Sequence, residues 1–236
     1  QREVGMLASR GLRQRLPCLD RDFAVGLGRE HQHDLGRVDV GHDPRATLGR
    51  AVLPLSVDLE EPSSGDTIVK ETIERFKRLD ILINNAGIAQ AKPILETEVE
   101  EWEHFMHTNA RAPFLLCRAA IPYLKNSDNA TIINVTSVVG RKGYINQAAY
   151  TASKHALRGF TKVLAQEVQE MGIRVHIIAP GGVATDMVTQ TRPDLDESIL
   201  IAPEEIAEMV LFLLTHRRNA VIDEINIRRA VSKAWK

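Results

Sequence analysis

Tyr150 and Lys154 are four residues apart, the spacing that brings two side chains to one face of a helix. A phenol ordinarily titrates near pH ~10, too high to exchange protons readily at neutrality. A nearby ammonium group favours the phenolate and lowers the phenol pKa. Such a tyrosine can then act as a general acid and base. The pair also has a plainer explanation, because Tyr and Lys at this spacing often form a partly exposed helix face.

Ser137 adds a second chemical group to this pair. It follows the apolar run Thr131–Val135, which we predict to be a strand. In α/β proteins, ligands bind at the carboxyl ends of the strands. A serine hydroxyl at that edge can donate a hydrogen bond to a substrate carbonyl and stabilise the alkoxide formed during its reduction. The structural alternative is a serine that caps a loop.

The remaining chain supplies elements that would hold these residues. Apolar runs predict strands at Leu53–Val57, Leu79–Ile83, Thr131–Val135, Ile173–Ile178 and Val221–Ile227. Cap signals and helical periodicity predict helices after Ser63 or Ser64, after a capping box of Thr97 and Glu100, over about Asn109–Leu124 and Ala149–Met171, and from Pro203. This alternation predicts an α/β fold, a doubly wound and mostly parallel sheet in a Rossmann-like three-layer sandwich.

Composition narrows the class of protein. The 236 residues carry a formal net charge of −1, which gives no electrostatic footprint for nucleic acid or an anionic membrane. Two cysteines, Cys18 and Cys117, cannot form a disulfide framework, and no Cys/His cluster suggests a metal. Apolar runs such as Met209–Leu214 are too short to span a bilayer. The Arg-rich start lacks an apolar signal-peptide core. We therefore expect a cytoplasmic protein of one domain that acts on a small molecule.

Five strings in order carry a resemblance to a known family. Ser137 with the Tyr150–Lys154 string resembles the active-site signature of the short-chain dehydrogenase/reductase family, in which the serine also lies thirteen positions before the tyrosine. The other matching strings are Asp58-Leu59, Asn84-Asn85-Ala86-Gly87, Asn109 within His107–Arg111, and Pro180–Thr185. The resemblance implies an oxidoreductase that transfers a hydride between a nicotinamide cofactor and a ketone, an aldehyde or an alcohol.

The resemblance implies a role for each catalytic residue. Tyr150 exchanges the proton with the substrate oxygen, and Ser137 holds and polarises that oxygen. Lys154 lowers the pKa of Tyr150 and binds the nicotinamide ribose. Asn109 helps to anchor a water molecule next to Lys154 that relays protons.

The resemblance also implies the residues of the cofactor cleft. Asp58 contacts adenine. The cleft is lined by Asn85, Ala86 and Gly87, with Tyr150 and Lys154, and by Pro180, Gly181, Val183 and Thr185 on the nicotinamide side.

Residues 1–52 match the family poorly, whereas residues 53–236 match it well. At the expected glycine-rich phosphate loop, Gly11 is retained, but Leu7 and Arg13 occupy the places of two glycines. Arg10 and Arg29 stand where NADP(H)-preferring members carry basic residues, so we expect NADP(H) rather than NAD(H). The alternative is an inactive Rossmann-like protein, or the product of a misread or decayed gene, with impaired cofactor binding.

Two further expectations concern the substrate and the oligomeric state. The region from Asp186 to Leu200 is where the family forms its substrate lid, and its mixed residues name no substrate. The resemblance implies a homodimer or homotetramer that pairs through the helices at Asn109–Leu124 and Ala149–Met171.

Overall fold

A parallel sheet forms the centre of the computed structural model, which describes residue 51 and residues 53–192 and 194–234. In the described residues the strand order is β1-β2-β3-β4. Every neighbouring pair is parallel. The strands are β1 (Ile81–Asn84), β2 (Thr131–Val135), β3 (Arg174–Pro180) and β4 (Glu224–Ile227). All carboxyl ends therefore lie at one edge of the sheet.

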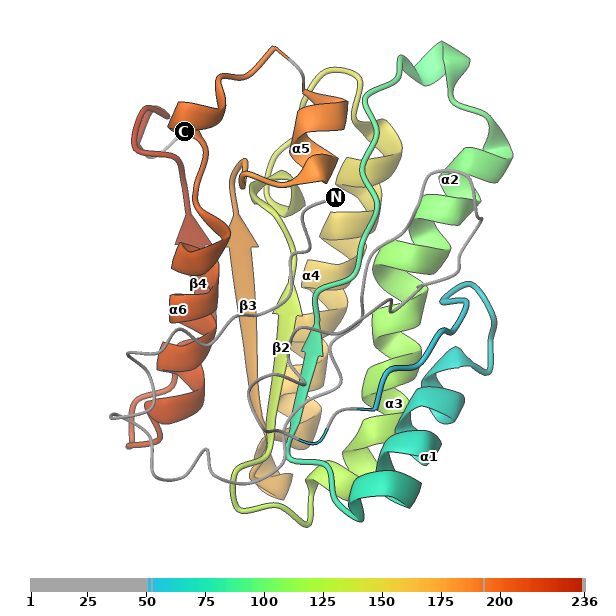
Figure 1. The fold of residues 1–236 in the computed structure, drawn as a ribbon, viewed down its shortest axis with the longest axis vertical. Coiled ribbons are helices and arrows are strands. Elements are labelled where there is room, and N and C mark those ends of the chain that lie inside the picture. The colour runs from blue at the N-terminus through green and yellow to red at the C-terminus, as the bar shows by residue number, and fades with distance from the viewer. Residues whose placement is uncertain (1–50, 52, 193, 235–236) are drawn as a thin grey trace.

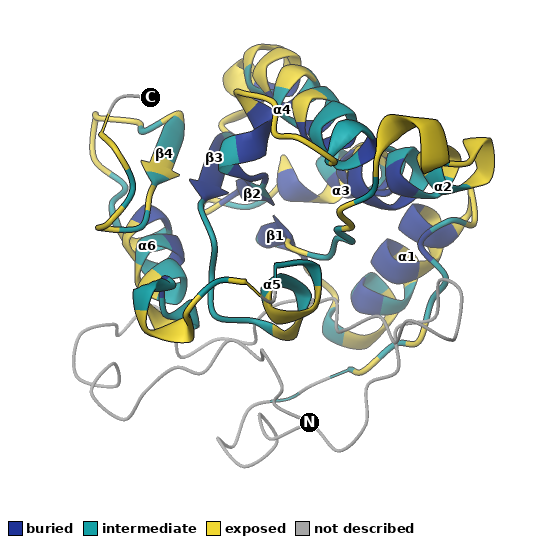
Figure 2. Cartoon of the chain, turned by 90° about the horizontal axis from the view of Figure 1, so that it is seen from above, coloured by how far each residue is buried: buried dark blue, intermediate teal, exposed yellow. Residues whose placement is uncertain are grey.

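Helices cover both faces of this sheet (Figures 1 and 2). α1, α3 and α4 lie on one face, and α6 lies on the other. The helices are α1 (Ser64–Phe76), α2 (Val99–Met106), α3 (Ala112–Leu124), α4 (Ala148–Val168), α5 (Asp186–Thr191) and α6 (Pro203–Thr215). This arrangement confirms the predicted Rossmann-like α/β fold.

The two helical layers follow from the apolar strands. Ile132 and Ile133 are both fully buried, and successive residues of a strand point to opposite faces. Ile132 belongs to the hydrophobic cluster under α1, α3 and α4, whereas Ile133 belongs to the cluster under α6. A strand that is apolar on both faces must be covered by helices on both faces, and β2 is covered in this way.

The strand predicted at Leu53–Val57 is wrong. Residues 53–57 form no strand in the structure, and Asp58, which follows them, makes a bridge of a single residue. The apolar side chains at the end of this segment are used in packing instead. Leu59 is buried in the larger hydrophobic cluster, and Val57 packs against that cluster. In the described residues, this run therefore contributes packing by Val57 and not a strand.

Two helix starts differ from their predictions by small shifts. The capping box lies one residue later than predicted, because the backbone N–H of Glu98 donates to Glu101 Oε2 at 2.8 Å. Thr97 instead donates its hydroxyl to the carbonyl of Pro93. The helix predicted from Asn109 begins with a π-helical turn, His107–Arg111, that joins α2 to α3. We call this segment the π turn.

Candidate active site

Ser137, Tyr150 and Lys154 meet at the carboxyl edge of the sheet. Ser137 follows β2, and its hydroxyl hydrogen-bonds with Tyr150. Tyr150 and Lys154 lie on α4 one turn apart, and Lys154 Nζ is 5.9 Å from the centroid of the Tyr150 ring. Lys154 is buried, and its ammonium donates to the carbonyl of Val135, the last residue of β2, at 3.3 Å. The structure thus brings together the three groups that the sequence singles out.

Burial controls the electrostatics of this group. Burial raises the pKa of Tyr150 above its ordinary value, and the hydrogen bond with Ser137 offsets part of that rise. Burial also lowers the pKa of the Lys154 ammonium to about 8. We expected Lys154 to lower the pKa of Tyr150, and in this structure burial outweighs any such effect. A surrounding of low polarity disfavours both charged forms, the phenolate and the ammonium.

Asn109 lies in the π turn and is fully buried. Its side-chain oxygen accepts from the backbone N–H of Ile88 at 2.9 Å. Its side-chain NH₂ donates to the carbonyl of Ile88 and to the hydroxyl of Ser153, each at 3.0 Å. Pro113 has no N–H to donate to the backbone carbonyl of Asn109 four residues earlier, as a regular α-helix requires. The π turn therefore coincides with the place where the helical hydrogen bond from residue 113 to Asn109 is absent.

Gly87 allows Asn109 and Lys154 to approach the segment after β1. A β-carbon at this position would lie 2.9 Å from Asn109 Oδ1 and 3.1 Å from Lys154 Nζ. A side chain would therefore displace both groups. Because Gly87 has no side chain, the Lys154 ammonium, which has three hydrogens to donate, lies close to the backbone that follows β1.

The loop after β3 lies beside Ser137. The Ser137 hydroxyl donates to the carbonyl of Pro180 at 3.4 Å. Gly181 donates its N–H to Ile227 of β4 at 2.7 Å, and Val183 forms a parallel bridge with Ile201. Thr185 ends the loop as the N-cap residue of α5. The loop is thus held to β4 and to the segment before α6.

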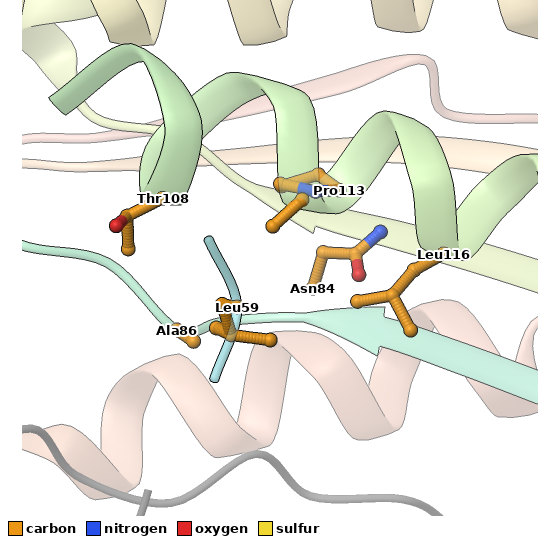
Figure 3. A pocket seen from close by; sticks show the side chains of 7 residues that line it. Leu59, Asn84, Ala86, Thr108, Pro113 and Leu116 are labelled. Atoms are coloured by element: carbon orange, nitrogen blue, oxygen red, sulfur yellow. The ribbon is translucent and has the colours of Figure 1, made fainter. Parts of the chain in front are cut away.

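The other candidate residues are more scattered. Ala86 is half-buried and Asn85 is exposed after β1. Asp58 lies in a separate turn, where its carboxylate accepts the N–H of Glu60 at 2.8 Å. A small cavity separates this turn from the π turn (Figure 3). It is lined by Leu59, Asn84, Ala86, Thr108, Ala112, Pro113 and Leu116. Arg10, Gly11 and Arg29 lie outside the described residues.

Sequence reasoning missed two features of the site. Ser153 links Asn109 to α4, because it accepts from Asn109 and donates to the carbonyl of Tyr150 at 2.9 Å. Its position within the matched string Tyr150–Lys154 was the available signal. The second feature is Glu60, which contacts His104 at 2.6 Å. Residues 60 and 104 are too far apart in sequence for local spacing to indicate this pair.

The sequence matches known proteins over most of its length. The model of the short chain dehydrogenase family matches residues 34–196. The chain is 33% identical to the 3-oxoacyl-[acyl-carrier-protein] reductase of Synechocystis sp. over 74% of this chain and 72% of that protein. It is 36% identical to the cyclopentanol dehydrogenase of Comamonas sp. over 84% of this chain and 89% of that protein.

A solved structure gives the same result. The crystal structure of a metagenomic short-chain oxidoreductase in complex with NADP superposes with a TM-score of 0.67 at 28% identity. The match covers 79% of this chain and 78% of that one. In the part of the chain that the structure describes, no helix combines the length and apolar character needed to cross a membrane.

Proposed function

The chain belongs to the short-chain dehydrogenase/reductase family of NAD(P)-dependent oxidoreductases, and we propose that it interconverts a ketone or aldehyde and the corresponding alcohol. The observation that carries this proposal is that Ser137, Tyr150, Lys154 and Asn109 come together at the carboxyl edge of the sheet, where Asn109 is joined to α4 through Ser153. The cofactor supplies the hydride, and the protein supplies the proton and the orientation.

Tyr150 is the general acid in reduction and the general base in oxidation. Its raised pKa keeps the phenol protonated at neutral pH, so a proton is ready for the substrate oxygen. Ser137 already hydrogen-bonds with this phenol, and its hydroxyl polarises the same substrate oxygen. One hydroxyl then donates the proton while the other orients the carbonyl.

Lys154 and Asn109 support this proton transfer. Below a pH of about 8 the Lys154 ammonium is charged and favours the phenolate that remains after Tyr150 gives up its proton. The same ammonium lies beside Gly87, where it would hold the ribose hydroxyls of the cofactor. Asn109 fixes the backbone of Ile88 on one side of the cleft and would help to hold a water that relays protons to Lys154.

The cofactor cleft extends from this group in two directions. Asn85, Ala86 and Gly87 would line its middle, and Asp58 would contact the adenine. On the nicotinamide side, the cleft would be lined by Pro180, Gly181, Val183 and Thr185. NADP(H) is favoured over NAD(H) by Arg10 and Arg29 at the positions of the family's basic residues. The solved relative also holds NADP.

The substrate is a small carbonyl compound or secondary alcohol. The relatives named above are a 3-oxoacyl-[acyl-carrier-protein] reductase and a cyclopentanol dehydrogenase, and their names supply two classes of probe, 3-oxoacyl compounds and cyclic ketones or alcohols. We further propose a cytoplasmic homodimer or homotetramer that pairs through α3 and α4. Exposed apolar residues on these helices, Phe114, Tyr123 and Val163, are consistent with such an interface.

The test is a cofactor titration followed by an activity assay. Purified protein should bind NADPH more tightly than NADH, as measured by quenching of the protein's tryptophan fluorescence. With acetoacetyl-CoA or cyclopentanone as the acceptor, the protein should then oxidise NADPH. Tyr150→Phe should retain binding and lose roughly 10²-fold or more of the activity. Failure to bind either cofactor at millimolar concentration would overturn the proposal and favour an inactive Rossmann-like protein.

A further inference from the structure

Glu60 connects the turn after Asp58 to the helical segment that carries Asn109. One oxygen of its carboxylate lies 2.6 Å from Nδ1 of His104, near the end of α2. The other oxygen lies 3.7 Å from Nδ1 of His107, the first residue of the π turn. The Arg111 guanidinium donates to the backbone carbonyl of Glu60. Side chain and backbone of a single residue thus hold the turn to this helical segment.

Asp58 and Leu59, the first two residues of the turn, are each held in place by a contact of their side chains. The Asp58 carboxylate accepts the backbone N–H of Glu60 at 2.8 Å. The Leu59 side chain is 2% exposed and packs into the larger hydrophobic cluster. Leu59 also lines the cavity that Ala86 and Thr108 share (Figure 3). Because the Asp58 carboxylate is bonded to the backbone of Glu60, a shift of Glu60 would move Asp58 with it.

The contacts of Glu60 are only partly screened by water. The side chains of Glu60 and His104 are 27% and 28% exposed, so their interaction exceeds that of a fully exposed pair. His107 and Arg111 stand two residues before and two residues after Asn109. The residues that hold Glu60 thus flank the buried asparagine of the catalytic group.

We propose that Glu60 is a positioning residue for the adenine end of the cofactor, which it serves by holding the Asp58–Leu59 turn against the π turn. This inference rests on the proposed function, because it takes that turn to be the adenine contact. Glu60 itself need not touch the cofactor. Its loss should weaken binding of the adenine half and leave the chemistry at Tyr150 intact.

Two hydride donors separate positioning of the adenine end from general support of the fold. NADPH carries the adenine half, whereas reduced nicotinamide mononucleotide lacks it. For Glu60→Ala, we expect the KM for NADPH to rise about fivefold, with kcat within about twofold of wild type. The value of kcat/KM with the mononucleotide should not change. Glu60→Gln, which retains the shape, should show a smaller rise.

The matched control is Glu61→Ala, because Glu61 is the exposed neighbouring glutamate. It should leave both donors unaffected. An equal loss with both donors, or an unchanged KM for NADPH in Glu60→Ala, would overturn the role of Glu60 while the proposed function stands. A wild-type protein that oxidises neither donor would overturn the proposed function and this inference with it.

Discussion

Asn109 and Lys154 approach the same glycine from two different helical segments. The side-chain oxygen of Asn109 and the ammonium of Lys154 would lie 2.9 and 3.1 Å from a β-carbon at Gly87. Asn109 belongs to the π turn and Lys154 to α4, so the strand end, the turn and the helix are mutually fixed at this point. Small changes here should alter catalysis more than stability.

Gly87→Ala should lower kcat/KM by roughly 10²-fold, because the added methyl group must push the Lys154 ammonium or the Asn109 amide out of position. Gly143→Ala is the matched control, since a β-carbon at Gly143 would meet nothing within 4 Å. Steady-state kinetics with NADPH and a ketone measure both variants. Comparable activity in the two alanine variants would contradict this account of Gly87.

Gly65→Ala should destabilise the fold by about 1–3 kcal/mol through overpacking. A β-carbon there would lie 2.6 Å from the carbonyl carbon of Leu115 and 2.9 Å from the backbone nitrogen of Leu116, where α1 crosses α3. Gly159→Ala in α4 meets no such neighbour and should stabilise by about 0.5–1 kcal/mol. Urea unfolding followed by circular dichroism measures both changes. If Gly65→Ala unfolds at the same urea concentration as wild type, the two helices do not pack this closely.

Carbonyl reduction should slow as the pH rises through about 8. Burial lowers the pKa of Lys154 to about 8, so the ammonium loses its charge above that pH while Tyr150, whose pKa is raised, keeps its proton. The pH profile of kcat/KM measures this loss. Lys154→Arg should be slower at every pH but should lack the alkaline decline, because arginine stays charged. An identical decline in the variant would assign it to another group.

The protein should lose stability as the pH falls below 6.5. Burial lowers the pKa of His176 below its ordinary value of 6.5, and its Nδ1 donates to the Ile222 carbonyl at 2.7 Å. Above pH 6.5 neither the folded nor the unfolded state protonates this histidine. Below it, the unfolded chain takes up a proton that the folded chain resists, so the free energy of unfolding falls until the folded pKa is reached.

His176→Asn should reduce this acid dependence, because asparagine can retain the donor to Ile222 without titrating. The exposed His155 provides the comparison, and His155→Asn should leave the dependence unchanged. Thermal unfolding measured on either side of pH 6.5 distinguishes the variants. Equal acid dependence in wild type and His176→Asn would remove His176 as the cause.

The bounds of an element could be predicted from the sequence where they depend on neighbouring residues alone. The apolar run of β2 gave its bounds correctly, and Pro203 marked the start of α6, because both signals depend only on neighbouring residues. The proximity of Ser137, Tyr150 and Lys154 was predictable from their spacing. Spacing on one helix and a position after a strand determine which residues can meet.

The features that the sequence did not reveal depend on contacts between distant segments. Leu53–Val57 has the composition of a strand, yet in the described residues this run forms none, and Val57 and the following Leu59 pack against the larger hydrophobic cluster instead. The contact of Glu60 with His104 joins residues 44 positions apart. The dominance of burial over the charge of Lys154 at Tyr150 is likewise a property of the surroundings and not of the spacing.

The π turn divides the segment from Val99 to Leu124 into two helices that are out of phase. An α-helix rotates by about 100° per residue, so one extra residue in a turn rotates everything after it by that angle. Deleting one residue between His107 and Arg111 would give a more regular and longer helix, yet it would turn Asn109 away from Ser153 or shift the buried face of α3. A regular helix and the contact of Asn109 with Ser153 are therefore incompatible at this position. A shortened variant should gain helix content and, if Asn109 has the proposed role, lose enzymatic activity.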